Sequence, residues 1–220
     1  MYTPSHFEES RQSALHSLMR AYPLAALITH SCEGVNAEHI PLLLVTSRDS
    51  NAALQGHVAR ANPFWQKISD GSDVLAIFQG PNRYISPQWY PSKKEHGQVV
   101  PTWNYLVVHA RGTIQWKRDA GWLRKHLEAA TATHERFGQP WRVSDAPSDF
   151  LERMLSAIVG FEIEISGLKG KWKLSQNRSK GDRLGVIAGL RGQSNTSARE
   201  MLEWMDDDGG GADRPIDPTR

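Results

Sequence analysis

Two stretches of the sequence have residue types that could hold a charged or a flat ligand. In the first, Gly56 to Pro63, a predicted strand ends and a predicted helix begins. Free backbone N–H groups and the helix dipole attract an anion at such a point. Arg60 could clamp that anion, and Asn62 could donate a further hydrogen bond. The alternative is an ordinary strand-to-helix turn with Arg60 in solvent.

The second stretch is Val100 to Tyr105, which combines aromatic rings with an amide. Trp103 and Tyr105 offer a platform for a flat ring, and Asn104 can both donate and accept at the edge of that ring. These properties match an isoalloxazine. The alternative is that Trp103 and Tyr105 pack between sheet and helix.

A third stretch, Gly170 to Arg178, is polar and basic where a strand is predicted to end. Its Lys173 and Gln176 are candidate ligand-binding residues. The segment could complete an anionic pocket, or it could be a solvated strand end.

Familiar catalytic and metal-binding motifs are missing. The sequence has no G-x-S-x-G elbow, no Walker A loop, no G-x-G-x-x-G turn and no H-E-x-x-H helix. The nine histidines include no H-x-x-x-H pair. We therefore predict no catalytic residue and no metal site.

Composition predicts one elaborated soluble domain. The chain has 220 residues, of which 39% are hydrophobic and 23% are charged. It contains neither an apolar signal region near its start nor an apolar run long enough to span a membrane. A single cysteine, Cys32, fits a reducing compartment, so we expect a cytoplasmic protein. The net charge of +2 permits an anionic ligand or nucleic acid without requiring either.

The elements that must position these residues are mostly strands. Ser5 and Glu8 form a capping box that predicts an opening helix ending at Pro23. A short helix is predicted from Asn62 through Ile68. Strands are predicted at 24–30, 40–45, 52–58 and 74–79, separated by turn signals at 33–34, 49–51 and 70–71.

A longer strand is predicted from Trp103 to Trp116, with one apolar and one mixed face. Helices are predicted over 119–137 and after Pro147. The β pattern resumes at Phe161 and passes Gly167 and Gly170 into a further strand at 171–174, so a strand pair is expected to close the barrel.

The C-terminal part is basic and helical. Helices are predicted at 182–190 and 196–205, whereas the Gly-rich, acidic residues 206–220 have almost nothing to bury and are predicted to be disordered. The predicted domains are a barrel at 1–177, a helical appendage at 178–205 and a tail at 206–220.

The sequence resembles the PaiB family of FMN-binding negative transcriptional regulators. The resemblance is carried by the three stretches above and by the motifs Met1-Tyr2-Thr3-Pro4, Ile77-Phe78-Gln79-Gly80-Pro81, Tyr84-Ile85-Ser86-Pro87-Gln88-Trp89-Tyr90-Pro91, Val159-Gly160-Phe161-Glu162-Ile163-Glu164 and Gly185-Val186-Ile187-Ala188-Gly189-Leu190. It implies an α+β fold, an antiparallel FMN-binding split β-barrel of six or so strands related to pyridoxamine-phosphate oxidases, with flanking helices. It also implies a homodimer that binds FMN between its subunits.

The resemblance further implies roles for particular residues. His39 would point at the flavin ring, and Gly56, His57, Arg60 and Asn62 would meet the phosphate. Trp103, Asn104 and Tyr105 would come from the partner subunit.

Three functions remain open at this point. The family resemblance implies a repressor that contacts DNA through its basic C-terminal segment, where Ala188 and Gly192 have the spacing of a helix-turn-helix turn. A flavin-dependent oxidoreductase is the alternative, with His39, His57 or His109 transferring protons. A haem-binding or haem-degrading barrel with a histidine axial ligand is a weaker third. The sequence does not separate ligand sensing from turnover.

Overall fold

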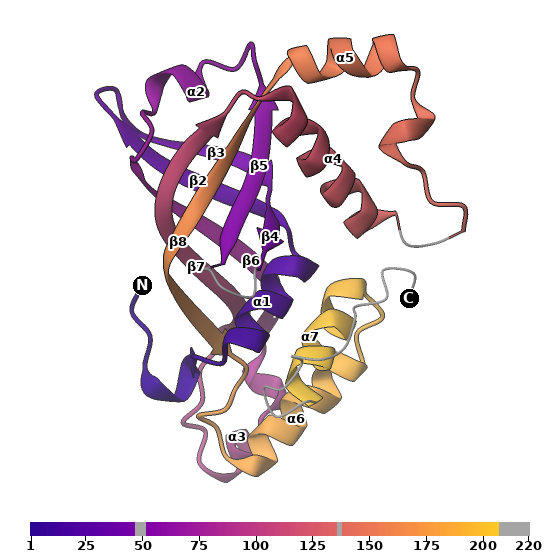
Figure 1. Cartoon of the computed structure of the whole chain (residues 1–220). Coiled ribbons are helices and arrows are strands. Elements are labelled where there is room, and N and C mark those ends of the chain that lie inside the picture. The colour runs from indigo at the N-terminus through magenta and orange to yellow at the C-terminus, as the bar shows by residue number, and fades with distance from the viewer. Residues whose placement is uncertain (47–51, 136–137, 207–220) are drawn as a thin grey trace. The chain divides into compact units, whose positions relative to one another are not determined.

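The computed structural model describes residues 1–46, 52–135 and 138–206 (Figure 1). The predicted turn at 49–51 and the tail from residue 207 lie outside these ranges. The chain divides into two compact units. Unit 1 comprises residues 1–22, 78–109 and those from 168 onward, and unit 2 comprises residues 23–77 and 110–167. The predicted boundary at residue 177 stays a prediction.

The strands of the described residues belong to one sheet in the order β3-β2-β6-β7-β8-β5-β4, and β1 pairs with β8. The registers of β1 with β8, of β2 with β3 and β6, and of β5 with β4 and β8 are antiparallel. The bounds are β1 Glu8–Glu9, β2 Leu24–Ser31, β3 Gly34–Pro41, β4 Leu43–Val45, β5 Ala53–Ala59, β6 Asp73–Ile85, β7 Thr102–Lys117 and β8 Ile158–Lys173.

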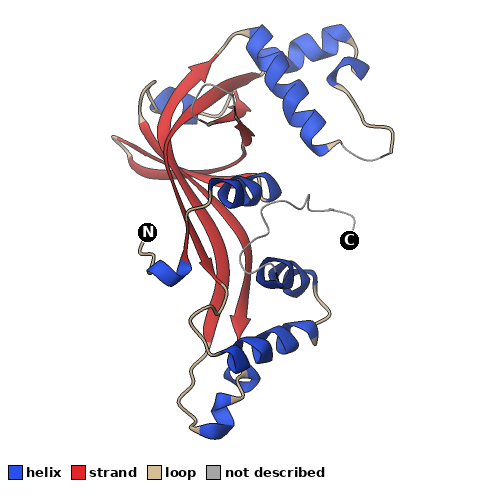
Figure 2. Ribbon diagram, turned by 60° about the horizontal axis from the view of Figure 1, so that its bottom comes forward, coloured by secondary structure: helices blue, strands red, loops and turns tan. Residues whose placement is uncertain are grey.

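Within the described residues, helices account for the rest of the regular structure and complete the predicted α+β class. The α-helices are α1 Gln12–Ala21, α2 Phe64–Lys67, α3 Ser92–Glu95, α4 Ala120–His134, α5 Ser148–Ser156, α6 Lys180–Arg191 and α7 Thr196–Asp206. Three 3-10 turns lie at Ser5–Phe7, Pro87–Trp89 and Val143–Asp145. Figure 2 shows α4 and α5 lying together, and α6 packs along α7. Within the described ranges, no helix is both long and apolar enough to cross a membrane.

The long strand β7 confirms the predicted alternation. Leu106, Val108, Ala110 and Ile114 are fully buried, whereas Arg111 on the other face is exposed. Period-two burial of this kind places one face of a strand against a core and leaves the other available for contacts. β7 therefore has a face that could serve a ligand or a partner.

The predicted start of the opening helix is wrong, because α1 begins several residues after the Ser5–Glu8 capping box. Ser5–Phe7 is a 3-10 turn, and Glu8 and Glu9 then pair with Lys171 and Gly170 of β8. The helix begins at Gln12, and no side chain caps it. Pairing with a distant strand displaced the local capping box, because the signal at Ser5 and Glu8 records only nearby residues.

Two strand predictions also change. Residues 40–45 belong to two strands, β3 and β4, and the backbone N–H of Leu42 between them donates to the carbonyl of Pro23 at 2.9 Å. The predicted strand pair near Gly167 and Gly170 is a single strand, β8. At Gly170 a Cβ would lie 2.3 Å from Leu15 Cδ2, so this glycine permits close packing and makes no turn.

Candidate functional site

A solvent-exposed aromatic surface lies at the start of β7 in unit 1. Trp103 is 52% exposed and contacts Tyr84 of β6 edge-on, with ring centroids 6.0 Å apart. Tyr84 is itself 47% exposed, and Val100, three residues before Trp103 in sequence, is exposed as well. Large apolar groups gathered at a surface typically mark a binding site. A flat ligand or a partner chain would bury them.

Lysines from the end of β8 are close to this surface. Lys171 Nζ lies 5.4 Å from the ring centroid of Tyr105, within cation–π range. Lys173 Nζ donates to Thr102 Oγ1. Burial lowers the pKa of Lys173, and the Tyr105 hydroxyl acts in the opposite direction. This part of unit 1 can therefore bind a flat, anionic group.

Asn104 has a different position from its neighbours. It is fully buried, and its Nδ2 donates to Ser175 Oγ at 3.0 Å. The Ser175 hydroxyl lies 3.2 Å from Asn104 Oδ1 in turn, and Ser175 has a φ of 64°. The amide thus fixes the chain just after β8, where the backbone adopts a left-handed conformation. Its hydrogen-bonding groups are occupied within the chain.

Gln176 is also engaged locally. Its Oε1 accepts from the backbone N–H of Leu174 at 2.6 Å, and its Nε2 donates to the carbonyl of Trp172 at 2.6 Å. These two bonds hold the end of β8 in place. A role for Gln176 at the flavin would be to position Lys173, three residues earlier.

Arg60, in unit 2, is bound to the end of a helix. Its Nε donates to the carbonyl of Ser156 at 2.6 Å and its Nη2 to that of Ile158 at 2.9 Å. Carbonyls at a helix C-terminus carry partial negative charge and lack partners in the helix, so a cation stabilises them. Through Ser156, Arg60 caps the C-terminus of α5, and through Ile158 it also binds the first residue of β8. A phosphate would have to share or displace these contacts.

Gly56 and His57 on β5 point to opposite faces. A Cβ at Gly56 would lie 2.6 Å from Phe161 Cζ, so the side chain that approaches this glycine is Phe161. His57 Nδ1 lies 3.1 Å from Nε2 of His126 on α4, and Trp122 stacks on the His126 ring at 5.3 Å. α4 therefore covers His57.

The two histidines have lowered pKa values. Burial lowers the pKa of His57, and burial together with the charge of His57 lowers that of His126 to about 4. His126 is 3% exposed, and its Nδ1 is buried without a hydrogen-bond partner in the described residues. The pair is neutral at neutral pH, which suits packing between helix and sheet.

Asn62 lines a polar cavity of about 260 Å³ in unit 2, together with Thr29, Asn36 and Lys67. Asn62 Oδ1 accepts from the backbone N–H of Phe64 at 2.9 Å, at the start of α2. The Thr29 hydroxyl is buried, and the described residues offer it no partner. A small polar group could bind here.

His39 lies on β3, at the end of the strand order, and is exposed. Ala26 of β2 is its cross-strand partner. Most of β3 is exposed, including Val35 at 74%. An edge strand this uncovered offers backbone and side chains to a second molecule.

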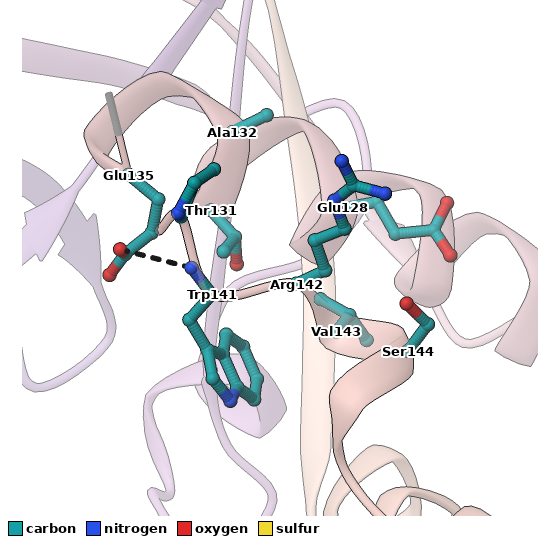
Figure 3. A pocket seen from close by; sticks show the side chains of 9 residues that line it. Glu128, Thr131, Ala132, Glu135, Trp141, Arg142, Val143 and Ser144 are labelled. Carbon is teal, nitrogen blue, oxygen red and sulfur yellow. Dashed lines mark hydrogen bonds between the residues drawn. The ribbon is translucent and has the colours of Figure 1, made fainter. Parts of the chain in front are cut away.

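A further cavity of about 360 Å³ lies between α4 and the segment that leads to α5 (Figure 3). Figure 3 shows the indole of Trp141 on one side of it and Glu128 and Arg142 on the other. The backbone N–H of Trp141 donates to Glu135 at 3.4 Å. None of the ten predicted ligand-binding residues lines this cavity.

The predicted residues thus form two groups, one in each unit. In unit 1, Trp103, Asn104, Tyr105, Lys173 and Gln176 share the adjoining ends of β7 and β8. In unit 2, Gly56, His57, Arg60 and Asn62 follow one another along β5 and the turn after it, while His39 lies on β3.

Sequence reasoning missed four residues that bear on these groups: Tyr84, Lys171, Ser175 and His126. Lys171 and Ser175 lie inside the third stretch, so their neighbours pointed to them. Tyr84 occurs in the aromatic motif 84–90. His126 falls one helical turn after Trp122, and that i, i+4 spacing was the available signal for a shared face.

Comparison with known proteins agrees with this fold. A family model described as "Putative FMN-binding domain" matches residues 1–167. The chain is 32% identical over 209 residues to the protease synthase and sporulation protein PAI 2 of Bacillus subtilis, covering 94% of the chain and 97% of that protein. It is 33% identical to the uncharacterized protein AN0679 of Emericella nidulans, covering 86% of the chain and 90% of that protein.

Solved structures show the same fold at low identity. The FAD and heme binding protein of Mycobacterium smegmatis has a TM-score of 0.56 at 15% identity, covering 76% of this chain and 73% of that one. Protein Rv2991 of Mycobacterium tuberculosis has a TM-score of 0.53 at 10% identity, covering 81% and 94%. The predicted α+β split β-barrel is confirmed. The chain belongs to the family of FMN-binding domains that this model describes, the PaiB family whose motifs its sequence carries, and FMN is its cofactor.

Proposed function

We propose that this protein is an FMN-binding homodimer that acts as a negative regulator of gene expression. The observation that carries the flavin part is the exposed Trp103–Tyr84 pair at the start of β7. Lys171 lies over the ring of the nearby Tyr105, and Lys173 donates to Thr102. The regulatory part is supported by the similarity to PAI 2, whose name links that relative to protease synthesis and sporulation.

The residues of unit 1 fit FMN. Trp103 and Tyr84 give the isoalloxazine an aromatic surface, and the two lysines supply positive charge for an anionic ligand. Asn104 and Gln176 hold the strand ends that carry these groups. Bound FMN supplies one- or two-electron redox chemistry at its ring. The chain's own part is to bind the ring and shield one face from water.

A second copy of the chain would cover surface that one copy leaves exposed. Val35 on the edge strand β3 and Trp103 at the start of β7 are large apolar residues in solvent. A symmetric dimer buries such surface twice with one set of contacts. Light scattering should give twice the chain mass of 24.7 kDa, and a value near 24.7 kDa at micromolar concentration would contradict the dimer.

The C-terminal helices constrain how DNA could be bound. α6 packs on the turn Pro87–Trp89, and a Cβ at Gly189 would lie 2.3 Å from the Trp89 ring. Arg183 donates to the carbonyl of Met205 at 2.8 Å, which ties α6 to α7. Arg191 and Arg199 are exposed. These two arginines are therefore the candidates for phosphate contacts.

The flavin part is tested by replacing the proposed ring contact. Trp103→Ala should weaken FMN and riboflavin binding alike, by about tenfold or more, because it removes stacking and leaves phosphate contacts intact. Trp141→Ala is the matched control, since Trp141 has a similar exposure and lies in unit 2. Unchanged affinity in the Trp103 variant would overturn the assignment.

The regulatory part is tested by measuring the affinity of the protein for a DNA fragment from the promoter of its own gene at several salt concentrations. Phosphate contacts release counterions, so affinity should fall linearly with salt on a log–log scale. The double variant Arg191→Ala, Arg199→Ala should have a shallower slope of log affinity against log salt, corresponding to about two fewer phosphate contacts. Its flavin content should be unchanged. Salt-independent or absent binding by the wild type would refute the regulatory proposal, and NADH oxidation by the same preparation would favour an oxidoreductase.

A further inference from the structure

Unit 2 contains a cavity that is separate from the residues proposed for FMN. It has a volume of about 360 Å³, within the range of small-molecule sites, and lies between α4 and the segment that leads to α5 (Figure 3). Its wall includes none of the predicted flavin residues and neither of the candidate DNA arginines. We propose that this cavity is a second ligand site, for a small organic ammonium ion with an apolar body.

The cavity exists because the core between α4 and the following segment stops short of the end of the helix. Leu123, near the start of α4, packs in a buried apolar cluster with Val143. Further along, α4 and its C-cap contribute four residues at spacings of three or four positions, which share one face: Glu128, Thr131, Ala132 and Glu135. These side chains are short or polar, so no large apolar group of this face fills the space beside Val143.

The indole of Trp141 forms one side of the cavity (Figure 3). Its side chain is 49% exposed, although it is large and mostly apolar. The face of an indole attracts a cation more strongly than any other aromatic side chain does. None of the described residues places a lysine or arginine head over this ring. A cationic ligand in the cavity would cover it.

The charges around Trp141 favour a cation. The wall contains two carboxylates, Glu128 and Glu135, and one guanidinium, Arg142. Figure 3 shows Arg142 on the same side as Glu128, and Asp145 Oδ2 accepts from the backbone N–H of Arg142 at 2.9 Å, so two acids offset this arginine. Glu135 lies on the other side, where it accepts from the backbone N–H of Trp141. Within the described residues it forms no ion pair, so its negative charge remains beside the indole.

The end of α4 adds to this negative potential. The helix ends at His134, and Glu135 is its C-cap residue. The last carbonyls of a helix lack partners within the helix and carry partial negative charge, so a cation is stabilised beside them. An ammonium group between Glu135 and the Trp141 ring therefore interacts favourably with the carboxylate, the helix end and the indole.

The rest of the wall fits the body of such a ligand. Ala132, Pro140 and Val143 provide apolar surface, and the hydroxyls of Thr131 and Ser144 can accept hydrogen bonds from an ammonium group. A small arylalkyl or alkyl ammonium ion has both parts. An anion of the same size would be repelled by the two glutamates of the wall.

The test is an NMR titration of the full FMN-loaded chain with benzylammonium, compared with neutral benzyl alcohol. The indole N–H resonance of Trp141, identified by its loss in Trp141→Phe, reports binding at this cavity. We expect a saturable shift of this resonance and an affinity for benzylammonium about tenfold higher than for benzyl alcohol, with no release of FMN.

Variants of the wall separate charge from packing. Glu135→Gln should weaken benzylammonium binding about fivefold, because it removes the charge and keeps the shape. Glu152→Gln, a matched change at an exposed residue of α5 outside the cavity, should bind benzylammonium as the wild type does. Trp141→Leu should weaken binding about tenfold, followed at the backbone amide of Ala132, whereas Trp141→Phe should retain most of it because it keeps an aromatic face.

Several outcomes would overturn the proposal. These are equal affinity for benzylammonium and benzyl alcohol, no saturable shift at millimolar concentration, release of FMN by benzylammonium, or equal effects of Glu135→Gln and Glu152→Gln. Equal binding by Trp141→Leu and the wild type would also overturn it. If Trp141→Leu fails to fold by circular dichroism, the two glutamine variants decide the question.

Discussion

Acid should destabilise this protein through the His57–His126 pair. Burial depresses the pKa of both histidines, and that of His126 falls from 6.5 to about 4. The unfolded chain therefore binds a proton at this residue between pH 6.5 and 4 that the folded chain does not bind. Stability from the neutral pair is complete above pH 6.5 and is lost progressively as the pH falls toward 4.

The size of the effect follows from linkage. A pKa difference of this kind amounts to roughly 3 kcal/mol in total, of which roughly 2 kcal/mol is lost between pH 7 and pH 5. Urea unfolding at the two pH values measures the loss. In His126→Gln the loss of unfolding free energy between pH 7 and pH 5 should be smaller by roughly these 2 kcal/mol, because glutamine can still hydrogen-bond His57 but does not titrate near neutral pH.

The control lies on the same helix. His134 is exposed at the end of α4, and His134→Gln should keep the wild-type pH dependence. An equal loss of stability between pH 7 and pH 5 in His126→Gln and in the wild type would refute this role of the histidine pair. If His57 itself contributes to the pH dependence, His57→Gln should lose somewhat less stability between pH 7 and pH 5 than the wild type does.

Three further changes test the packing around the two groups. Gly189→Ala should lower the free energy of unfolding by about 1–3 kcal/mol, because the new Cβ would collide with the ring of Trp89. Gly181→Ala on the same helix is the control and should be tolerated, because the nearest atom to its Cβ, Ser179 Oγ, lies 4.0 Å away. Asp182→Ala should cost about 2–3 kcal/mol in urea unfolding, because its carboxylate accepts from the backbone N–H and the hydroxyl of Ser92 at 3.1 and 2.8 Å. Arg60→Ala should lower the melting temperature by uncapping α5, and if Arg60 also binds the phosphate, FMN affinity should fall about tenfold or more while riboflavin affinity is unchanged.

Much of the sheet was predictable because its strands alternate strictly. β7 was expected at 103–116 and spans 102–117, and its buried face was correctly assigned. The helices α4 and α5 followed from their apolar stripes, and Asp119 caps α4 by accepting from the N–H of Trp122. These features depend on neighbours within a few residues, which sequence patterns record directly.

Contacts between distant residues were not predictable in the same way. His57 and His126 are 69 positions apart, and Asn104 and Ser175 are 71 apart. Nothing local distinguishes a histidine that faces another histidine from one that faces a ligand. For the same reason Gly170 resembled a turn, although its small size serves the approach of Leu15.

Predicted site residues that are adjacent in the sequence differ in their solvent exposure. Trp103 is exposed as a ring contact requires, whereas Asn104 is buried and paired with Ser175. Adjacent residues on a strand face opposite ways, so a motif read as a block mixes surface and core. The roles of these residues in flavin binding remain predictions.

The Trp103–Tyr84 surface is the proposed FMN site of this chain. The most direct measurement is the absorption spectrum of the protein peak after incubation with FMN and gel filtration, for the wild type and for Trp103→Ala. Paired flavin bands should co-elute with the wild type and be strongly reduced in the variant. A wild-type peak without flavin bands, or equal bands in both proteins, would contradict this assignment of the site.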